Sequence, residues 1–416
     1  PRRPSRPRCT VDMARVHLLA SAALGVLLAC RPAPERRGAG EGPRDSAGIT
    51  IRRLPPLPEI TSPAWHSTGL FTTLALDSLP LGRLVDARFQ ADGSVIITQD
   101  TRLLRLAPDG RLAGTMGREG DGPGEFRLIT ALGLAADGTL LIGDLTQRVT
   151  ELNPESRALR ALPFLGGPAP RYERVPAALL PDGGILASYW QQRPNRDTPG
   201  LHLGAFDRDS APLLLYDSSG ALVAALGTWP GLERARVTLD GEPARLPPPF
   251  ARTFLIRSRG RATAVTVTDS LDLSLYRDTT LVLRLIGPAP AAGPSRADLA
   301  SWELALKRDF PDVAERYLRA IHEAPRVPTL PALEGLGLDD LGRLWIGYRR
   351  LATDSLRRWL VLAPDGTPLG HLDLPALPLQ ALPGGRELLD IAGDRLALLR
   401  EVPTGEPYVE VRRFHP

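Results

Sequence analysis

The sequence predicts an all-β protein, a six-bladed β-propeller built from four-stranded antiparallel blades. Three observations lead to this fold class. An Asp-Gly pair followed by an apolar run recurs every 45 residues, at 92–93, 137–138 and 182–183. The 40 glycines and 42 prolines are spread along the chain, as expected for short strands separated by turns. No run after Cys30 reaches 18 continuous apolar residues, so the repeats are expected to be soluble.

Each repeat contains a second turn. Residues 103–117 hold an apolar strand, the turn Asp109-Gly110 and an outer strand, and this order recurs at 213–227 and 359–374. Each Asp-Gly pair predicts a hairpin, because glycine accepts the positive φ that a tight turn needs. With the strand before it, each unit has four strands, and the period is typical of propeller blades. We count six units, at residues 84–117, 128–164, 173–227, 251–287, 333–374 and 387–414.

The two ends of the propeller are expected to share one sheet. The last unit ends at Phe414 with three recognisable strands, and Leu70–Leu76 is a suitable fourth strand from upstream of the first unit. Such pairing leaves no long open sheet edge, so the blades are predicted to close into a ring within 68–416.

A segment of helical periodicity interrupts the repeats between the fourth and fifth units, at residues 295–324. Ser295 and Asp298 form an N-cap pattern, Pro311 is expected to begin a second helix, and Pro325 follows its end. We therefore predict an inserted helical hairpin. Its apolar stripe consists of Leu299, Trp302, Leu306, Val313, Tyr317 and Ile321.

The amino terminus has the pattern of a secretory signal. Met13 is the plausible start, Leu18–Ala29 is an apolar run, and Leu27–Cys30 resembles the lipobox of bacterial lipoproteins. That resemblance implies cleavage before Cys30 and lipidation of its thiol, which would anchor the protein to a membrane. A plain secretory signal is the alternative. Residues 1–29 are then an upstream extension with a signal peptide, and 30–67 a tether.

The predicted cleavage changes the charge of the chain. The formal net charge of +4 belongs to residues 1–29, which hold five arginines and one aspartate. The remaining chain is neutral, so we expect no nucleic-acid partner. Cys9 and Cys30 are the only cysteines, so no disulfide or cysteine-based metal site is expected after cleavage.

A family resemblance covers roughly residues 45–416. The stretch Asp45–Ile49, the loop Gly117–Phe126, the Asp-Gly strand starts and the late helical insertion resemble the bacterial six-bladed β-propeller lipoproteins related to NHL-repeat proteins. The resemblance implies the six-bladed propeller fold. It implies no particular activity.

Two loops contain candidate binding residues. In the glycine-rich loop 117–126, Arg118, Glu119 and Glu125 are candidates at a propeller mouth; alternatively, the loop only links two blades and Phe126 packs between them. In the third unit, Trp190 and Arg193 belong to a polar loop that either forms a binding edge or, for Trp190, fills the gap between blades.

Residues suited to catalysis or metal binding do not form a coherent set. The five histidines after the signal have no short ligand spacing, and the two asparagines do not begin inner strands. Asp100 and Asp144 occupy matched positions, either as a ring of carboxylates or, as we favour, as turn residues that accept backbone N–H groups. We expect no cofactor and no metal.

These observations favour a lipid-anchored, extracytoplasmic propeller of the bacterial cell envelope that binds or scaffolds a protein or carbohydrate partner. One alternative is a metal-dependent hydrolase or lyase with its site in the central channel, since propellers host both classes of function. Another is a structural partner of an envelope complex, with the hairpin 295–324 as the contact.

Overall fold

Short strands in which buried and exposed residues alternate make up most of the chain. In β26 (Pro368–Pro375), Gly370, Leu372 and Leu374 are buried, while Leu369 and Asp373 face solvent. This period of two places one row of side chains in the core. The structure is a computed structural model that describes residues 44–46, 48–73, 84–146, 148–153, 158–163, 174–189, 205–290, 292–377, 379–381, 387–402 and 405–416.

Gly40–Pro416 forms one compact unit; the other unit, Pro1–Ala39, lies outside the described residues. Six groups of antiparallel strands follow one another along the compact unit. Groups 1 and 2 have four strands each, as predicted. Group 1 consists of β4 (Leu84–Phe89), β5 (Val95–Gln99), β6 (Arg102–Leu106) and β7 (Leu112–Met116). Group 2 consists of β10 (Ile129–Leu134), β11 (Leu140–Asp144), β12 (Arg148–Leu152) and β13 (Ala158–Pro163).

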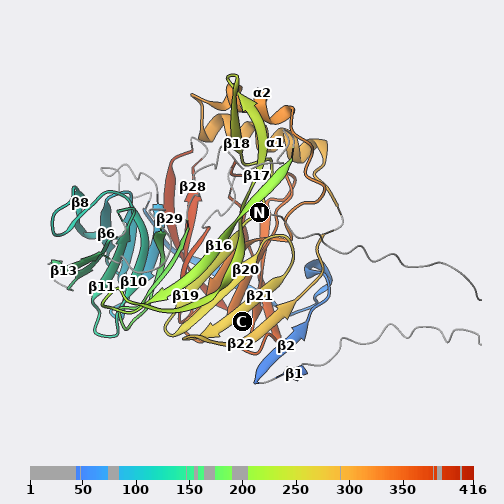
Figure 1. The fold of residues 1–416 in the computed structure, drawn as a ribbon. Coiled ribbons are helices and arrows are strands. Elements are labelled where there is room, and N and C mark those ends of the chain that lie inside the picture. The colour runs from blue at the N-terminus through green and yellow to red at the C-terminus, as the bar shows by residue number, and fades with distance from the viewer. Residues whose placement is uncertain are drawn as a thin grey trace, which may run out of the picture. The chain divides into compact units, whose positions relative to one another are not determined.

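Groups 3 and 4 have more than the four predicted strands. Group 3 consists of β14 (Arg174–Leu179), β15 (Ile185–Tyr189), β16 (Phe206–Tyr216), β17 (Leu222–Leu239) and β18 (Glu242–Leu246). Group 4 consists of β19 (Phe254–Arg259), β20 (Ala262–Val267), β21 (Asp272–Arg277) and β22 (Thr280–Ile286), extended by β2 (Ile49–Arg53) and β1 (Arg44–Ser46). β2 runs parallel to β22, and β1 pairs with β2 at the edge of the sheet (Figure 1). Part of the predicted tether is therefore a strand.

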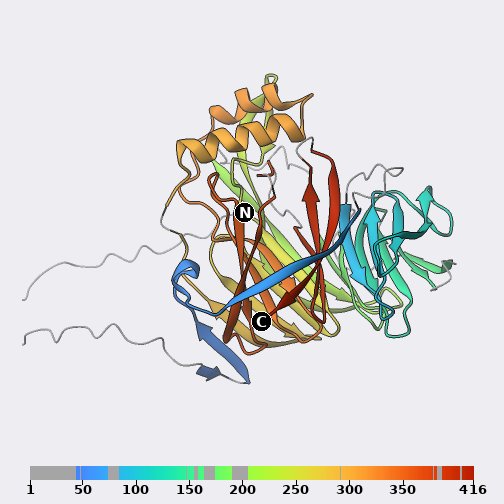
Figure 2. The ribbon, with the colours of Figure 1, turned by 180° about the vertical axis from the view of Figure 1, so that it is seen from behind.

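Groups 5 and 6 are joined by a strand from near the beginning of the compact unit. Group 5 consists of β23 (Leu333–Leu338), β24 (Leu344–Tyr348), β25 (Leu356–Leu362) and β26. Group 6 consists of β27 (Leu388–Ala392), β28 (Arg395–Glu401), β29 (Pro407–His415) and β3 (Ala64–Thr72). β3 pairs antiparallel with β29, and its first two residues pair in parallel with the middle of β26 (Figure 2). This confirms the predicted closing strand, although it begins at Ala64 rather than at Leu70.

The Asp-Gly turns have the predicted conformation. In the turn between β4 and β5, Gly93 has a φ of 87°, and the Asp92 carboxylate accepts the Ser94 backbone N–H at 2.8 Å. Gly138 and Gly183 repeat this conformation in groups 2 and 3. Because the strands are antiparallel, the turns that follow the first and third strands of each group lie at the same ends of the strands. We call this side of each group the turn edge. The side at the opposite ends of the strands is the loop edge.

Apolar side chains form a separate cluster between each pair of neighbouring groups. Groups 1 and 2 share the cluster around Phe126, and groups 2 and 3 share the cluster around Tyr216. Further clusters join groups 3 and 4, 4 and 5, and 5 and 6. A sixth cluster, around Phe89 and Val409, joins group 6 to group 1. The first strands β4, β10, β14, β19, β23 and β27 also contact one another in this order, and β27 contacts β4.

Two inserted segments build a structure at the loop edge that we call the cap, comprising residues 233–246 and 296–322. The end of β17 continues beyond the end of β15 and pairs with β18, while α1 (Arg296–Asp309) and α2 (Ala314–His322) pack beside it (Figure 1). The helical hairpin is confirmed, although its second helix begins at Ala314 rather than Pro311. No helix in the described residues is both long and apolar enough to cross a membrane.

Candidate functional site

The glycine-rich loop holds its charged residues against one another. The Arg118 Nη2 lies 2.6 Å from the Glu125 Oε1, and the Gly122 backbone N–H donates to Glu125 Oε2 at 2.8 Å. These two contacts, the Gly122 N–H first, lower the pKa of Glu125. Glu119 is exposed and lies 3.7 Å from an arginine of the same loop, Arg127. All three candidates thus lie in one exposed loop, and the carboxylate of Glu125 is already engaged by other residues of that loop.

The linking role of this loop is confirmed by Phe126. Its side chain is fully buried and packs with Leu103 and Met116 of group 1 and with Ile129 of group 2. An aromatic ring between two sheets stabilises their contact by burying a large apolar surface. The other candidates, Trp190 and Arg193, and the predicted lipidation site Cys30, lie outside the described residues.

Asp144 is a structural turn residue, as we favoured. Its buried carboxylate accepts the backbone N–H of Thr146 at 3.0 Å and pairs with Arg148 at 3.0 Å. The histidines lie apart: His371 contacts the hydroxyl of Ser62, and His322 lies 3.3 Å from Glu303. Across the described ranges, no group of three His, Cys, Asp or Glu residues is placed to hold a metal ion. No observation there favours the metal-dependent alternative.

The cap has an apolar core of its own. Trp302 and Leu306 of α1 and Leu318 of α2 are buried against Ala235 and Val237 of β17. The Trp302 indole N–H donates to the Ala381 carbonyl at 2.9 Å, which ties α1 to the segment before group 6. At the start of α1, Ser295 and Asp298 cap each other's backbone N–H groups in a capping box, as the sequence predicted. Segments far apart in the sequence therefore support one rigid surface.

A groove with a volume of about 280 Å³ opens in the cap between the two helices and the segments that flank them. Leu299, Trp302 and Ile321 supply apolar surface, while Glu303 and His322 supply polar groups. The volume lies near the lower end of the range of small-ligand sites, about 300–1,000 Å³, and the mixture of apolar lining and few polar groups is typical of them.

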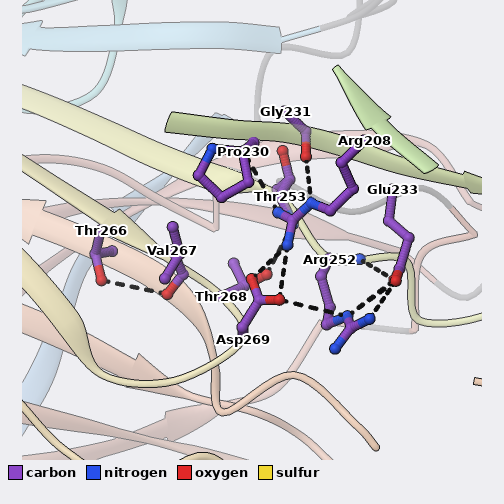
Figure 3. Close-up of polar contacts among 10 residues, drawn as sticks. All are labelled: Arg208, Pro230, Gly231, Glu233, Arg252, Thr253, Thr266, Val267, Thr268 and Asp269. Carbon is purple, nitrogen blue, oxygen red and sulfur yellow. Dashed lines mark hydrogen bonds and ion pairs between the residues drawn. The ribbon is translucent and has the colours of Figure 1, made fainter. Parts of the chain in front are cut away.

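Ion pairs fix the base of the cap to the sheet (Figure 3). Arg208 of β16 donates to both carboxylate oxygens of Asp269 at 2.7 Å and to the Gly231 carbonyl at 2.8 Å. Arg252 binds Glu233 of β17, and its hydrogen bonds to that carboxylate raise the pKa of Arg252. The Arg252 guanidinium binds Glu233 through both Nε and Nη2, and such bidentate arginine–carboxylate pairs have a defined geometry. The network therefore holds β16 and β17 against residues 252 and 269, which lie next to β19 and β20 of group 4.

A second network of ion pairs lies at the loop edge of groups 5 and 6. Arg357 of β25 lies 2.7 Å from both Glu334 and Glu387. Arg400 of β28 lies 2.8 Å from Glu387 and 3.0 Å from Glu410. Arg357, Glu387 and Arg400 are all buried. Their ion pairs place a charge of opposite sign next to each of these buried charges, which offsets the cost of removing them from water.

The positive charges of two arginines beside this network are not offset by ion pairs among the described residues. Arg349 and Arg350 follow β24, and Arg350 is only 9% exposed. Arg349 Nη1 and Arg350 Nε are buried without a hydrogen-bond partner among the described residues. Burial lowers the pKa of both guanidinium groups, and for Arg350 the nearby charge of Arg357 acts in the same direction. The following segment contacts the cap, because the Ala352 N–H donates to Asp298 at 3.0 Å.

Arg349 and Arg350 are not among the candidate residues predicted from the sequence. An Arg-Arg pair directly after the apolar strand Leu344–Tyr348 resembles an ordinary charged turn. The signal that separates it from such a turn is burial, which depends on the cap and on group 6, far away in the sequence.

The inner strands carry a third charged cluster. Asp390 of β27 accepts the Phe89 backbone N–H at 2.8 Å and lies 2.7 Å from Arg259 of β19. Arg88 of β4 pairs with Asp86 at 2.8 Å and lies 3.9 Å from Asp390. Residues of groups 1, 4 and 6 thus meet in one set of mutual ion pairs, which is a structural arrangement rather than an open ligand site.

Comparisons with known proteins give no family for this chain. No family model and no curated protein matches it. A solved structure from Bacteroides fragilis, of a protein described as exported, has a TM-score of 0.46 and 11% identity, and the match covers 88% of this chain and 100% of that one. A member of the DUF4221 family from Bacteroides vulgatus has a TM-score of 0.42 and 11% identity, covering 86% of this chain and 98% of that one. These similarities are too weak to carry a conclusion about fold or function.

Proposed function

We propose that the protein is a lipid-anchored, six-bladed β-propeller of the bacterial cell envelope that binds a ligand or partner through its cap. The lipobox-like Leu27–Cys30 supports the anchor and the location outside the cytoplasm. The apolar clusters between successive groups, which return from group 6 to group 1, support the six-bladed propeller. The motifs Asp45–Ile49 and Gly117–Phe126 support its relation to NHL-type lipoproteins.

The groove in the cap is the observation that carries the binding role. Most strands repeat one four-stranded pattern, whereas β18, α1 and α2 depart from it and meet at a single place. Loops and insertions on a rigid scaffold are where binding residues concentrate. The groove also combines apolar surface with the pair His322 and Glu303, so it can receive an amphipathic segment of a partner.

Exposed apolar side chains on the same helices extend this surface. Leu304 of α1 is 69% exposed, and Phe310 and Val313 at the turn between the helices are also exposed. Exposed apolar side chains on these helices favour a protein partner, because burying them on association is favourable.

Photo-crosslinking in intact cells tests this role. A photoreactive amino acid replaces Glu303, in the groove, or Asp137, an exposed residue at the turn edge of group 2, in the full-length chain. We expect a discrete adduct from position 303 and none from position 137. Adducts of equal yield from both positions, or none from position 303, would contradict the cap as the binding surface.

A further inference from the structure

Arg349 and Arg350 are adjacent arginines that directly follow β24. Glu334 and Asp354 both act on the pKa of each guanidinium group. Arg350 is about nine-tenths buried, and its Nε has no partner among the described residues. Arg349 Nη1 is buried and unpartnered as well. The feature is therefore two adjacent arginines, each with a buried donor that has no partner among the described residues.

The neighbouring carboxylates are already engaged. Glu334 and Glu387 bind Arg357 at 2.7 Å. Asp354 accepts the Leu351 backbone N–H at 2.7 Å, and Asp298 accepts N–H groups at the start of α1 and from Ala352. None of these carboxylates forms an ion pair with Arg349 or Arg350 within the described part of the chain. Arg349 and Arg350 therefore have no ion-pair partner of their own among the described residues.

A buried guanidinium without a partner is costly, because removal from water is not repaid by an opposite charge or by hydrogen bonds. Groups of this kind call for an explanation such as a missing ion. Arginine presents its donors in a planar fork that fits a carboxylate or phosphate with two parallel hydrogen bonds. Leu351, the next residue, is 38% exposed, so the pair lies close to solvent.

We propose that Arg349 and Arg350 bind a carboxylate group of the ligand at the loop edge, beside the cap. A single negative charge suits this place better than a phosphate dianion, because Glu334 and Glu387 lie close by and would repel additional charge. The Ala352 contact with α1 connects this site to the cap. The inference rests on the proposed binding role and names the ligand chemistry.

Thermal unfolding of the mature, lipidated protein in detergent tests the site. The probes are sodium acetate, sodium succinate, sodium phosphate and sodium chloride at equal ionic strength. A ligand that binds only the folded state raises Tm in a saturable manner. We expect acetate or succinate to raise Tm more than chloride does. A response to phosphate without one to the carboxylates, or responses equal to that of chloride, would overturn the proposal.

Two substitutions separate binding from folding. Arg350→Met removes an unpartnered charge, so we expect an unchanged or higher Tm without ligand and loss of the carboxylate response. Arg358→Met is the matched control: Arg358 lies two residues beyond the start of β25, is exposed and pairs with Asp373 at 2.8 Å. It should keep the response. A carboxylate response that survives Arg350→Met would overturn the assignment.

Titration calorimetry gives a second readout that does not depend on unfolding. Arg350→Lys keeps the charge and loses the fork, and we expect it to weaken carboxylate binding about tenfold or more, since hydrogen bonds to charged groups are strong. Equal affinity in wild type and Arg350→Lys would count against the proposal. Failure here leaves the crosslink at position 303 intact, whereas failure of the proposed function removes that crosslink, so the two outcomes are distinguishable.

Discussion

The contact between β3 and β26 gives a quantitative prediction about the packing of the strand that joins groups 5 and 6. Trp65 of β3 is buried, stacks on Phe414 at 5.7 Å between ring centroids and meets Trp345 edge-on at 5.8 Å. Below its indole lies Gly370 of β26, where an added Cβ would come 2.1 Å from Trp65 Nε1. Only glycine fits there while the tryptophan is present.

We therefore predict strong coupling between Trp65→Ala and Gly370→Ala. Trp65→Ala should lower the free energy of unfolding by about 3–5 kcal/mol, the usual cost of truncating a buried tryptophan. Gly370→Ala alone should cost about 1–3 kcal/mol, because the methyl group forces the indole to move. In the Trp65→Ala background the same substitution should cost less than about 0.5 kcal/mol, since the space is empty.

Urea unfolding at 25 °C, followed by circular dichroism, measures the four free energies of this double-mutant cycle. Gly114→Ala in β7 is the matched control, because a Cβ there would meet nothing within 4 Å; it should be neutral or slightly stabilising. If Gly370→Ala costs the same with and without Trp65, β3 is not seated on β26 and the reasoning fails.

Four further predictions follow from single contacts. Phe126→Ala should lower the free energy of unfolding by about 3–5 kcal/mol, because the ring is fully buried between groups 1 and 2; a loss under 1 kcal/mol in urea unfolding would contradict that packing. Arg118→Ala should change it by less than about 0.5 kcal/mol in the same assay, because the side chain is exposed; a larger loss would give the loop a different role. Burial raises the pKa of Tyr348 to about 12. Since the phenol then ionises more readily in the unfolded state, stability should fall as pH rises from about 10 to 12, and Tyr348→Phe should reduce this slope; an equal slope in both proteins would refute this. Cys30→Ala should abolish incorporation of labelled fatty acid and release the protein from membranes, as followed by metabolic labelling and fractionation; unchanged labelling would exclude Cys30 as the anchor.

The repeats and the helices could be predicted because local sequence determines them. Each Asp-Gly turn needs a glycine at positive φ and an aspartate whose carboxylate accepts the backbone N–H two residues further along the chain. Turns such as Asp92-Gly93 can therefore be predicted from the sequence alone. The capping box at Ser295 and Asp298 is a similar local signal. Even the closing strand followed from counting three strands in the last unit.

The strand β2 and the cap could not be predicted, because they depend on distant partners. Ile49–Arg53 is half apolar and becomes a strand by pairing with β22, more than two hundred residues away. The end of β17 is polar enough to resemble a loop until β18 and α2 cover it. Arg350 illustrates the same limit at the candidate site. Its burial, and the absence of a partner for its Nε among the described residues, are properties of the assembled loop edge and not of the Arg-Arg pair.

Hydrogen exchange read by mass spectrometry tests most directly that the loop edge beside the cap binds the ligand. The mature protein is compared with and without saturating succinate. We predict slower exchange in peptides that cover 347–354 and the start of α1, and no change in peptides that cover the turns at 92–93 and 137–138. Slower exchange confined to those turns, or no protection at 347–354, would contradict the binding site.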